Sequence, residues 1–320
     1  MKLMLTITFL ALGYQSASAQ SLLQTFGSGA NQFTMEFVTI GNPNNVPDTT
    51  GVPNPVGSVA YVYNIGKYEV SREQIDKANA AGSLGITLQN MSSYGGNGLL
   101  KPATGISWYE AAKYVNWLNT STGGTAAYKF DGSGTFQLWS AGDAGYNASN
   151  KFRNSNAKFW LPSTDEWYKG AYGKADGTWS NFANGSDSAP TAVASGTEAN
   201  TAVYGGQAGP ADIADAGGLS AYGTMAQGGN AGELTETAYD GSNDIAWEDR
   251  ELRGGSWGSV YVYGFNLGAS NRAIIDGPAY ENLKEEFREF GFRVASVPEP
   301  SSLSLLAIGL GGLALVRRRK

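Results

Sequence analysis

Three segments of the chain carry the start signal of a helix. Ser71, Ser107 and Ser163 are each followed three residues later by Gln or Glu, the capping-box pattern that satisfies two backbone amides at once. After Ser107, apolar side chains recur every three or four residues as far as Leu118. The sequence therefore predicts helices that begin directly after these serines, and Gly82 is expected to end the first of them in the left-handed conformation.

Strands are predicted to be short and far apart. Apolar and β-branched residues indicate strands at 33–40, 59–65, 251–253 and 291–295. The segments 20–32 and 41–57 are predicted to be loops, and most of 119–150 and 174–232 is Gly, Ser, Asn, Thr and Ala. The pattern favours an α+β domain with many loops and little regular secondary structure.

Both ends of the chain have the composition of targeting segments. Residues 1–19 combine Lys2, an apolar run and a small-residue cleavage pattern, which predicts a secretory signal peptide. At the other end, Pro298-Glu299-Pro300 precedes an uncharged run over 301–316 and a basic end over 317–320. A 16-residue helix spans about 24 Å, so this run with its flanks can serve as a membrane span before processing.

That C-terminal arrangement resembles the PEP-CTERM sorting signal, which implies an exosortase as a partner and a Gram-negative bacterium as the host. The implied destination is the cell envelope, the outer surface or the extracellular matrix. The predicted organisation is a signal peptide (1–19), an N-terminal lead (20–35), one domain (36–296) and the sorting signal (297–320).

Charge and residue usage exclude several functions. Outside 1–19 and 301–320, the chain has 17 Lys and Arg against 28 Asp and Glu, which argues against nucleic acid as a partner. The chain contains no cysteine and no histidine, so it has no thiolate chemistry, no imidazole base and no His-ligated metal.

Five motifs in order resemble the formylglycine-generating enzyme (sulfatase-modifying factor) family. The opening segment 63–71 and the helix motif 106–118 come first, followed by 161–167, where Trp160 precedes in place of the usual arginine. Segment 221–234 has Gly232 and Leu234 where the family has tryptophans, and 253–257 with 291–293 forms the closing signature. The resemblance implies a fold related to C-type lectins.

The resemblance also implies what this chain has lost. Catalytic members hold copper with two cysteines after the closing Gly-Gly-Ser motif, and the matching positions lie near Ser259 and Gly264. A serine hydroxyl is no soft copper ligand, so no copper is expected. Ser259 has no histidine to activate it, and we expect it to be inert.

A structural calcium ion is the cofactor that the resemblance implies. The matching Asn and Glu side chains are Asn230 and Glu233, and hard oxygen ligands of this kind suit calcium. The alternative is a glycine-rich turn capped by Asn230.

The predicted ligand cleft follows from the closing signature. Aromatic residues alternate after the Gly-Gly-Ser motif, and two arginines match positions on the family's cleft floor. The cleft residues are Trp257, Ser259, Tyr261, Tyr263, Arg272 and Arg293. The alternatives are core packing for the aromatics and buried hydrogen bonds for the arginines, to carboxylates such as Glu69 or Glu166.

Three functional hypotheses stay open. The first is a catalytically inactive binding module for an extracellular polysaccharide or a peptide. The second is a hydrolase acting on exopolysaccharide, which would need a carboxylate pair from Asp165 and Glu166 or from the acidic residues at 233, 236, 240 and 244. The third is a purely structural surface protein.

Overall fold

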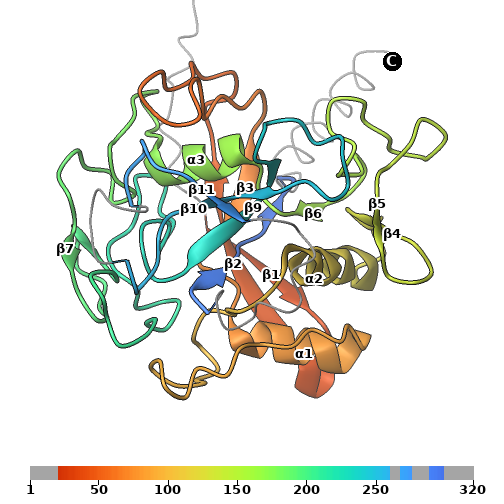
Figure 1. Ribbon diagram of the computed structural model, residues 1–320, viewed down its shortest axis with the longest axis horizontal. Helices are drawn as coiled ribbons and strands as arrows, with labels where there is room; N and C mark the ends of the chain where they lie inside the picture. The colour runs from red at the N-terminus through yellow and green to blue at the C-terminus, as the bar shows by residue number, and fades with distance from the viewer. Residues whose placement is uncertain (1–20, 260–266, 276–287, 299–320) are drawn as a thin grey trace, which may run out of the picture.

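The computed structural model describes residues 21–259, 267–275 and 288–298, and its ribbon is mostly loops around short strands and helices (Figure 1). The strands are β1 (Ser21–Phe26), β2 (Phe33–Ile40), β3 (Tyr63–Gly66), β4 (Lys129–Phe130), β5 (Phe136–Gln137), β6 (Phe159–Trp160), β7 (Thr191–Ala192), β8 (Thr201–Ala202), β9 (Gly232–Ala238), β10 (Arg250–Arg253), β11 (Ala273–Ile275), β12 (Phe290–Gly291) and β13 (Ala295–Ser296). The helices are α1 (Arg72–Gly82), α2 (Trp108–Ser121), α3 (Thr164–Tyr172) and the 3-10 turn η1 (Gly29–Asn31).

Two sheets organise the described residues. The larger sheet has the order β1-β2-β3-β13-β6 with antiparallel pairing throughout. The smaller sheet has the order β11-β10-β9-β12, in which β12 runs parallel to β9. The pairs β4–β5 and β7–β8 form separate ribbons within the loops. The fold is therefore α+β, as predicted.

The three predicted helix starts are confirmed. Ser71, Ser107 and Ser163 are the N-caps of α1, α2 and α3, and each forms both hydrogen bonds of the capping box. The predicted end of α1 is wrong by one residue. Gly82 is still helical, and Ser83 takes the left-handed conformation at φ 52°.

The predicted loop at 20–32 is wrong, because it contains β1. This strand pairs with β2 along its whole length, from Ser21 opposite Val38 to Phe26 opposite Phe33. It lies at the edge of the sheet, and Phe26 is its one buried residue. An edge strand with so little buried surface has a weak hydrophobic pattern, and the pairing depends on β2.

The predicted strand at 291–295 is two strands in different sheets. Gly291 belongs to β12 beside β9, whereas Ala295 belongs to β13 between β3 and β6. The residues between them, including Arg293, therefore pass from the smaller sheet to the larger one. The strand predicted at 59–65 begins only at Tyr63.

Aromatic side chains dominate the core. Trp108 at the start of α2 has its ring 5.1 Å from those of Tyr128 and Phe136, in edge-to-face contacts. The guanidinium of Arg250 lies 4.6 Å from the Trp108 ring and 4.1 Å from that of Phe152. These contacts attach the β4–β5 ribbon and β10 to α2.

No helix within the described part of the chain has the length and hydrophobicity that a membrane crossing requires. The predicted signal peptide (1–19) and the apolar run 301–316 lie outside the described residues.

Candidate functional site

The Gly-Gly-Ser signature is a tight turn that follows β10. Gly254 and Gly255 both have positive φ, at 92° and 70°. A Cβ atom on Gly254 would lie 2.7 Å from the backbone oxygen of Gln227, so a side chain cannot fit there. The glycines of this signature are explained by backbone geometry alone.

Ser259, at the expected cysteine position, is buried and hydrogen-bonded within the turn. Its Oγ accepts a hydrogen bond from the Ser256 amide at 3.0 Å, and its carbonyl accepts one from Gly205 at 2.6 Å. The Ser256 hydroxyl donates to a carboxylate oxygen of Glu289. This arrangement positions the turn and gives Ser259 a structural role.

Trp257 belongs to the core and does not line an open cleft in the described structure. It is 5% exposed and packs in a cluster with Met91, Val203 and Met225. Its ring lies 5.6 Å from that of Tyr94.

The other predicted cleft residues do not come together with Trp257. Tyr261 and Tyr263 lie outside the described residues. Arg293 is fully buried between the two sheets. Arg272 lies beside the smaller sheet, with its guanidinium 4.0 Å from the Tyr239 ring and 3.4 Å from a Glu251 oxygen.

Arg293 and Glu233 form a buried ion pair. Arg293 donates to both carboxylate oxygens, at 2.6 Å from Nε and 2.5 Å from Nη2. The remaining N–H groups reach the carbonyls of Gly66, Lys67 and Met225 at 2.8–3.3 Å. Carboxylate pairing of Arg293 was anticipated as an alternative, but the partner is Glu233.

Asn230 joins a second buried carboxylate to the backbone. Its Nδ2 donates to Glu69 at 2.6 Å, and its Oδ1 accepts from the Ala211 amide at 2.7 Å. The other Glu69 oxygen accepts from the Ala231 amide at 2.8 Å. Burial, followed by the charge of Glu233, raises the pKa of Glu69 to about 8, against the opposing effect of Arg293.

The side chains of Asn230 and Glu233 do not fit calcium in this arrangement. Asn230 has protein partners for its oxygen and its nitrogen, and both Glu233 oxygens accept from Arg293. A divalent cation would have to replace a guanidinium at hydrogen-bond distance. Among the described residues, no group of three or more acidic side chains is placed to hold a metal. Asn230 has the positive φ, 60°, of the turn alternative.

A third buried network explains the unusual Trp160. Its Nε1 lies 3.0 Å from both oxygens of Glu166. Arg153, in the segment just before β6, stacks on the Trp160 ring at 4.6 Å and lies 3.5 Å from both Glu166 and Glu236. The positive charge that the family has at position 160 is supplied here from position 153. Glu166 and Glu236 are therefore bound by protein groups inside the core, away from any described hollow.

The loop between β9 and β10 forms an acidic surface hollow of about 370 Å³. The amide of Tyr239 donates to the carbonyl of Asp249 at 2.9 Å, which closes the base of the loop. We name it the Tyr239–Trp247 hollow, and its lining consists of Tyr239, Asp240, Trp247, Glu248 and Asp249. Trp247 is 76% exposed, the largest exposure among the large hydrophobic side chains of the described residues.

Buried Arg250 at the start of β10 and half-buried Asn243 within the loop hold this loop in place. Arg250 donates to the carbonyls of Ala246 and Glu248 while its guanidinium lies on the Trp108 ring. The Asn243 side chain accepts from the Ala238 amide at 2.8 Å. Trp247 was not among the predicted site residues, because a single tryptophan in a polar loop has no sequence pattern that distinguishes exposure from burial.

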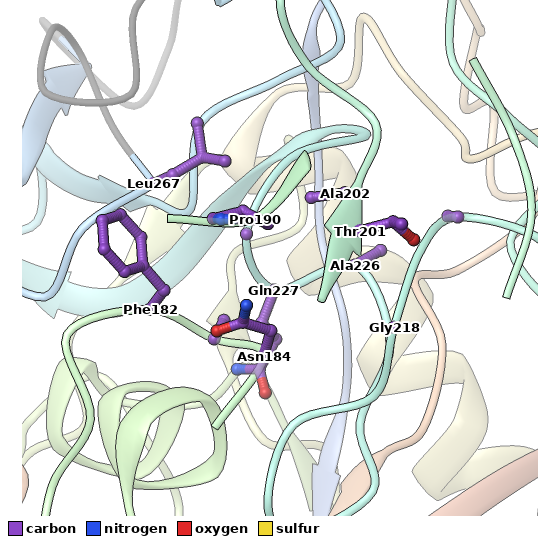
Figure 2. Close-up of a pocket in the computed structure, with 12 residues that line it drawn as sticks. Phe182, Asn184, Pro190, Thr201, Ala202, Gly218, Ala226, Gln227 and Leu267 are labelled. Carbon is purple, nitrogen blue, oxygen red and sulfur yellow. The ribbon is translucent and has the colours of Figure 1, made fainter. Parts of the chain in front are cut away.

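A second hollow lies beside β7 and β8 and is lined by Phe182, Asn184, Gln227 and Leu267, among others (Figure 2). Its free volume is about 10 Å³, which is room for about one water molecule. This volume excludes it as a site for a sugar or a peptide side chain.

Replacement of Arg293 by Met should be strongly destabilising. Glu233 would stay buried with Trp167 as its remaining side-chain donor, at 2.6 Å, and such uncompensated charges cost about 3–5 kcal/mol. Arg272→Met is the control, because Glu251 would still have Arg253 as an ion-pair partner at 3.2 Å. This substitution should lower the free energy of unfolding by about 1 kcal/mol or less. Urea unfolding measures both, and Glu233→Gln in the Arg293→Met background should recover part of the loss. Equal costs for the two arginines would contradict the buried-pair argument.

Calcium should leave the melting temperature unchanged relative to chelator, because the oxygens of Asn230 and Glu233 already accept hydrogen bonds. A structural site at hundredfold excess over Kd would add about 2.7 kcal/mol, which corresponds to a rise of roughly 5–10 °C. Scanning calorimetry of the intact domain in calcium and in chelator measures this difference. A rise of that size would favour the calcium hypothesis from the sequence and overturn our view of these two side chains.

The model of the sulfatase-modifying factor enzyme 1-like domain matches residues 32–297, and that of the PEP-CTERM protein-sorting motif matches residues 296–320. A search of curated proteins gave no match.

Among solved structures, Treponema denticola variable protein 1 aligns with a TM-score of 0.56 and 20% identity, over 87% of this chain and 99% of that one. CarF aligns with a TM-score of 0.56 and 17% identity, over 83% and 99%. PvdO from Pseudomonas aeruginosa aligns with a TM-score of 0.50 and 16% identity, over 86% and 98%. At these identities the structural likeness shows the fold alone. The match to the domain model covers most of the chain, so this protein belongs to the sulfatase-modifying factor enzyme 1-like (formylglycine-generating enzyme) family and ends in a PEP-CTERM sorting motif.

Proposed function

We propose that this exported, exosortase-sorted protein is a catalytically inactive binding module of the cell envelope or outer surface, and that it binds an extracellular glycan. The family domain and the sorting motif support export to the envelope or surface. The absence of cysteine supports the loss of copper chemistry, since the copper ligands and the reactive group of the family are thiolates.

The observation that carries the binding proposal is the Tyr239–Trp247 hollow. An indole that is 76% exposed offers a flat apolar face on which a sugar ring can stack. The carboxylates of Asp240 and Glu248 line the same hollow and can accept hydrogen bonds from sugar hydroxyls. Arg272, one of the predicted cleft residues, lies against the Tyr239 ring and extends the polar edge of the hollow.

Glu248 supports this role because its carboxylate oxygens are weakly satisfied by the protein. Both its carboxylate oxygens are inaccessible to solvent and have no hydrogen bond of good geometry from a described side chain, and the Ile245 backbone and the Arg250 charge offset their burial only in part. Unpaired buried oxygens of this kind are costly, and a small shift of the side chain would bring them to the donors of a ligand. A rigid loop also lowers the entropic cost of binding, and Arg250 and Asn243 provide that rigidity.

A hydrolase at the same hollow is the second candidate. Burial raises the pKa of Glu248, and the charges of Asp240 and Asp244 add to the effect. A carboxyl with a raised pKa beside an ionised one is the acid–base arrangement of glycosidases. A purely structural role, with no ligand at all, is the third candidate.

The purified protein should not convert a cysteine of a sulfatase-derived peptide to formylglycine, with or without added copper. The reaction in this family requires thiolates that the chain does not contain. Mass spectrometry of the peptide measures the conversion, and a catalytic family member serves as the positive control. Conversion that depends on this protein would contradict the proposed inactivity.

Replacement of Trp247 by Ala should weaken glycan binding about tenfold or more, equivalent to about 1.4 kcal/mol. A glycan array on the wild-type protein identifies the ligand, and calorimetry compares the variants. Val46→Ala is the matched control, since Val46 is 75% exposed and does not line the hollow. Both positions are exposed, so neither change should alter the melting temperature.

Each other outcome selects a different function. Equal binding by wild type and Trp247→Ala would place the ligand elsewhere. Release of reducing sugar that disappears in Glu248→Gln would support the hydrolase. If the protein binds peptides but no glycan, its ligand is a peptide. If it binds neither, the structural role is favoured.

A further inference from the structure

A third hollow, of about 300 Å³, lies where β1 and β2 meet the start of α1 and the loop at 210–214. Part of its wall is apolar and exposed, since Leu23 and Leu100 are 67% and 53% accessible to solvent. Its lining shares no residue with the Tyr239–Trp247 hollow. The volume suits a short aliphatic chain.

Four carboxylates line this hollow, and three of them have a lysine partner. Glu36 pairs with Lys67 at 3.0 Å, Glu73 with Lys77 at 2.7 Å and Asp212 with Lys101 at 3.3 Å. These three ion pairs are partly exposed, and within each pair the lysine largely neutralises the charge of its carboxylate. The fourth carboxylate, Glu69, has no lysine partner among the described residues.

Glu69 is also the most deeply buried of the four, at 2% exposure. Its hydrogen bonds come from neutral donors, the amide of Ala231 and the Asn230 side chain. The guanidinium of Arg293, whose charge lowers the pKa of Glu69, is already paired with Glu233. Glu69 is thus a carboxyl group beside an apolar hollow whose direct partners are all uncharged.

We infer that this hollow is a binding site for an aliphatic primary ammonium group on a short apolar chain, with Glu69 as its counterion. The apolar part of the ligand would contact Leu23, Leu100 and Ile213, and the ammonium group would supply the cation that Glu69 lacks. A lysine side chain and the amino terminus of a peptide that begins with an apolar residue both have this chemistry. This site is independent of the proposed glycan site.

Binding of an ammonium ion should release a proton. The pKa of Glu69 is raised to about 8, so the free hollow holds a protonated carboxyl at neutral pH, and the bound cation requires the ionised form. Affinity should therefore rise about tenfold between pH 6 and pH 7 and level off above about pH 8. The other charged groups around Glu69 are Glu36 with Lys67, Glu73 with Lys77, Asp212 with Lys101, and Glu233 with Arg293, and each is already ion-paired.

Calorimetry with hexylamine, and with hexanol as the uncharged control, tests the site on the intact protein. Hexylamine should bind at least tenfold more tightly than hexanol at pH 8. The binding enthalpies measured at pH 7 in phosphate and in Tris should differ, because about one proton is released on binding and the two buffers have different heats of ionisation. Glu69→Gln should abolish the pH dependence, whereas Glu73→Gln, which changes a carboxylate that is already paired, should retain it.

Two further probes distinguish the sources of the ammonium group. Nα-acetyl-lysine amide represents a lysine side chain, and the peptide Leu-Gly-Gly represents an apolar amino terminus. Equal binding of hexanol and hexylamine, no binding of hexylamine, or an unchanged pH dependence in a folded Glu69→Gln variant would each overturn the inference. A melting curve of the variant confirms that it is folded, and failure here would leave the glycan proposal intact.

Discussion

The buried pair of Arg293 and Glu233 is the interaction on which the arrangement of the two sheets depends. Arg293 lies on the short connection from β12 to β13, where the chain passes from the smaller sheet to the larger one. Its bonds reach the β3 carbonyl of Gly66, the loop carbonyl of Met225 and the β9 carboxylate of Glu233. A guanidinium has donors in enough directions to connect three segments at once, which neither a lysine nor an apolar residue can do.

The parts of the fold that were predicted from sequence are those set by local interactions. A capping box involves residues three positions apart, so Ser107 and Glu110 specify a helix start regardless of the remaining chain. The edge strand β1 and the division of 291–295 between two sheets depend on partners far along the chain. A hydrophobic pattern does not identify such partners, and the sequence therefore predicted a loop at 20–32 and a single strand at 291–295.

The difference between local and long-range interactions also explains which features of the candidate site were predicted. The resemblance to the family located Glu233, Arg293 and Trp257, but it did not predict that the first two pair with each other and that the third is buried. The tryptophan at position 160, where the family usually has an arginine, shows why such pairing is not visible in the sequence. Trp160 is anomalous in the motif, and its compensation by Arg153 becomes visible only when both residues contact Glu166. Charge balance in a core belongs to the set of residues that the fold brings into contact, as it does Arg153 with Glu166 and with Glu236 of β9.

The residues of the family signature have structural roles that do not depend on catalysis. Gly254 is required by the close approach of the Gln227 carbonyl, and Ser256 organises the following turn through Ser259. Neither role involves copper or a thiol, so the motif has a structural reason to be present in a chain that contains no cysteine. New binding surfaces would then arise where the scaffold constrains the sequence least, in loops held by a few buried groups. The loop that carries Trp247 has this property, since Arg250 holds its backbone through carbonyl oxygens that any side chain would leave available.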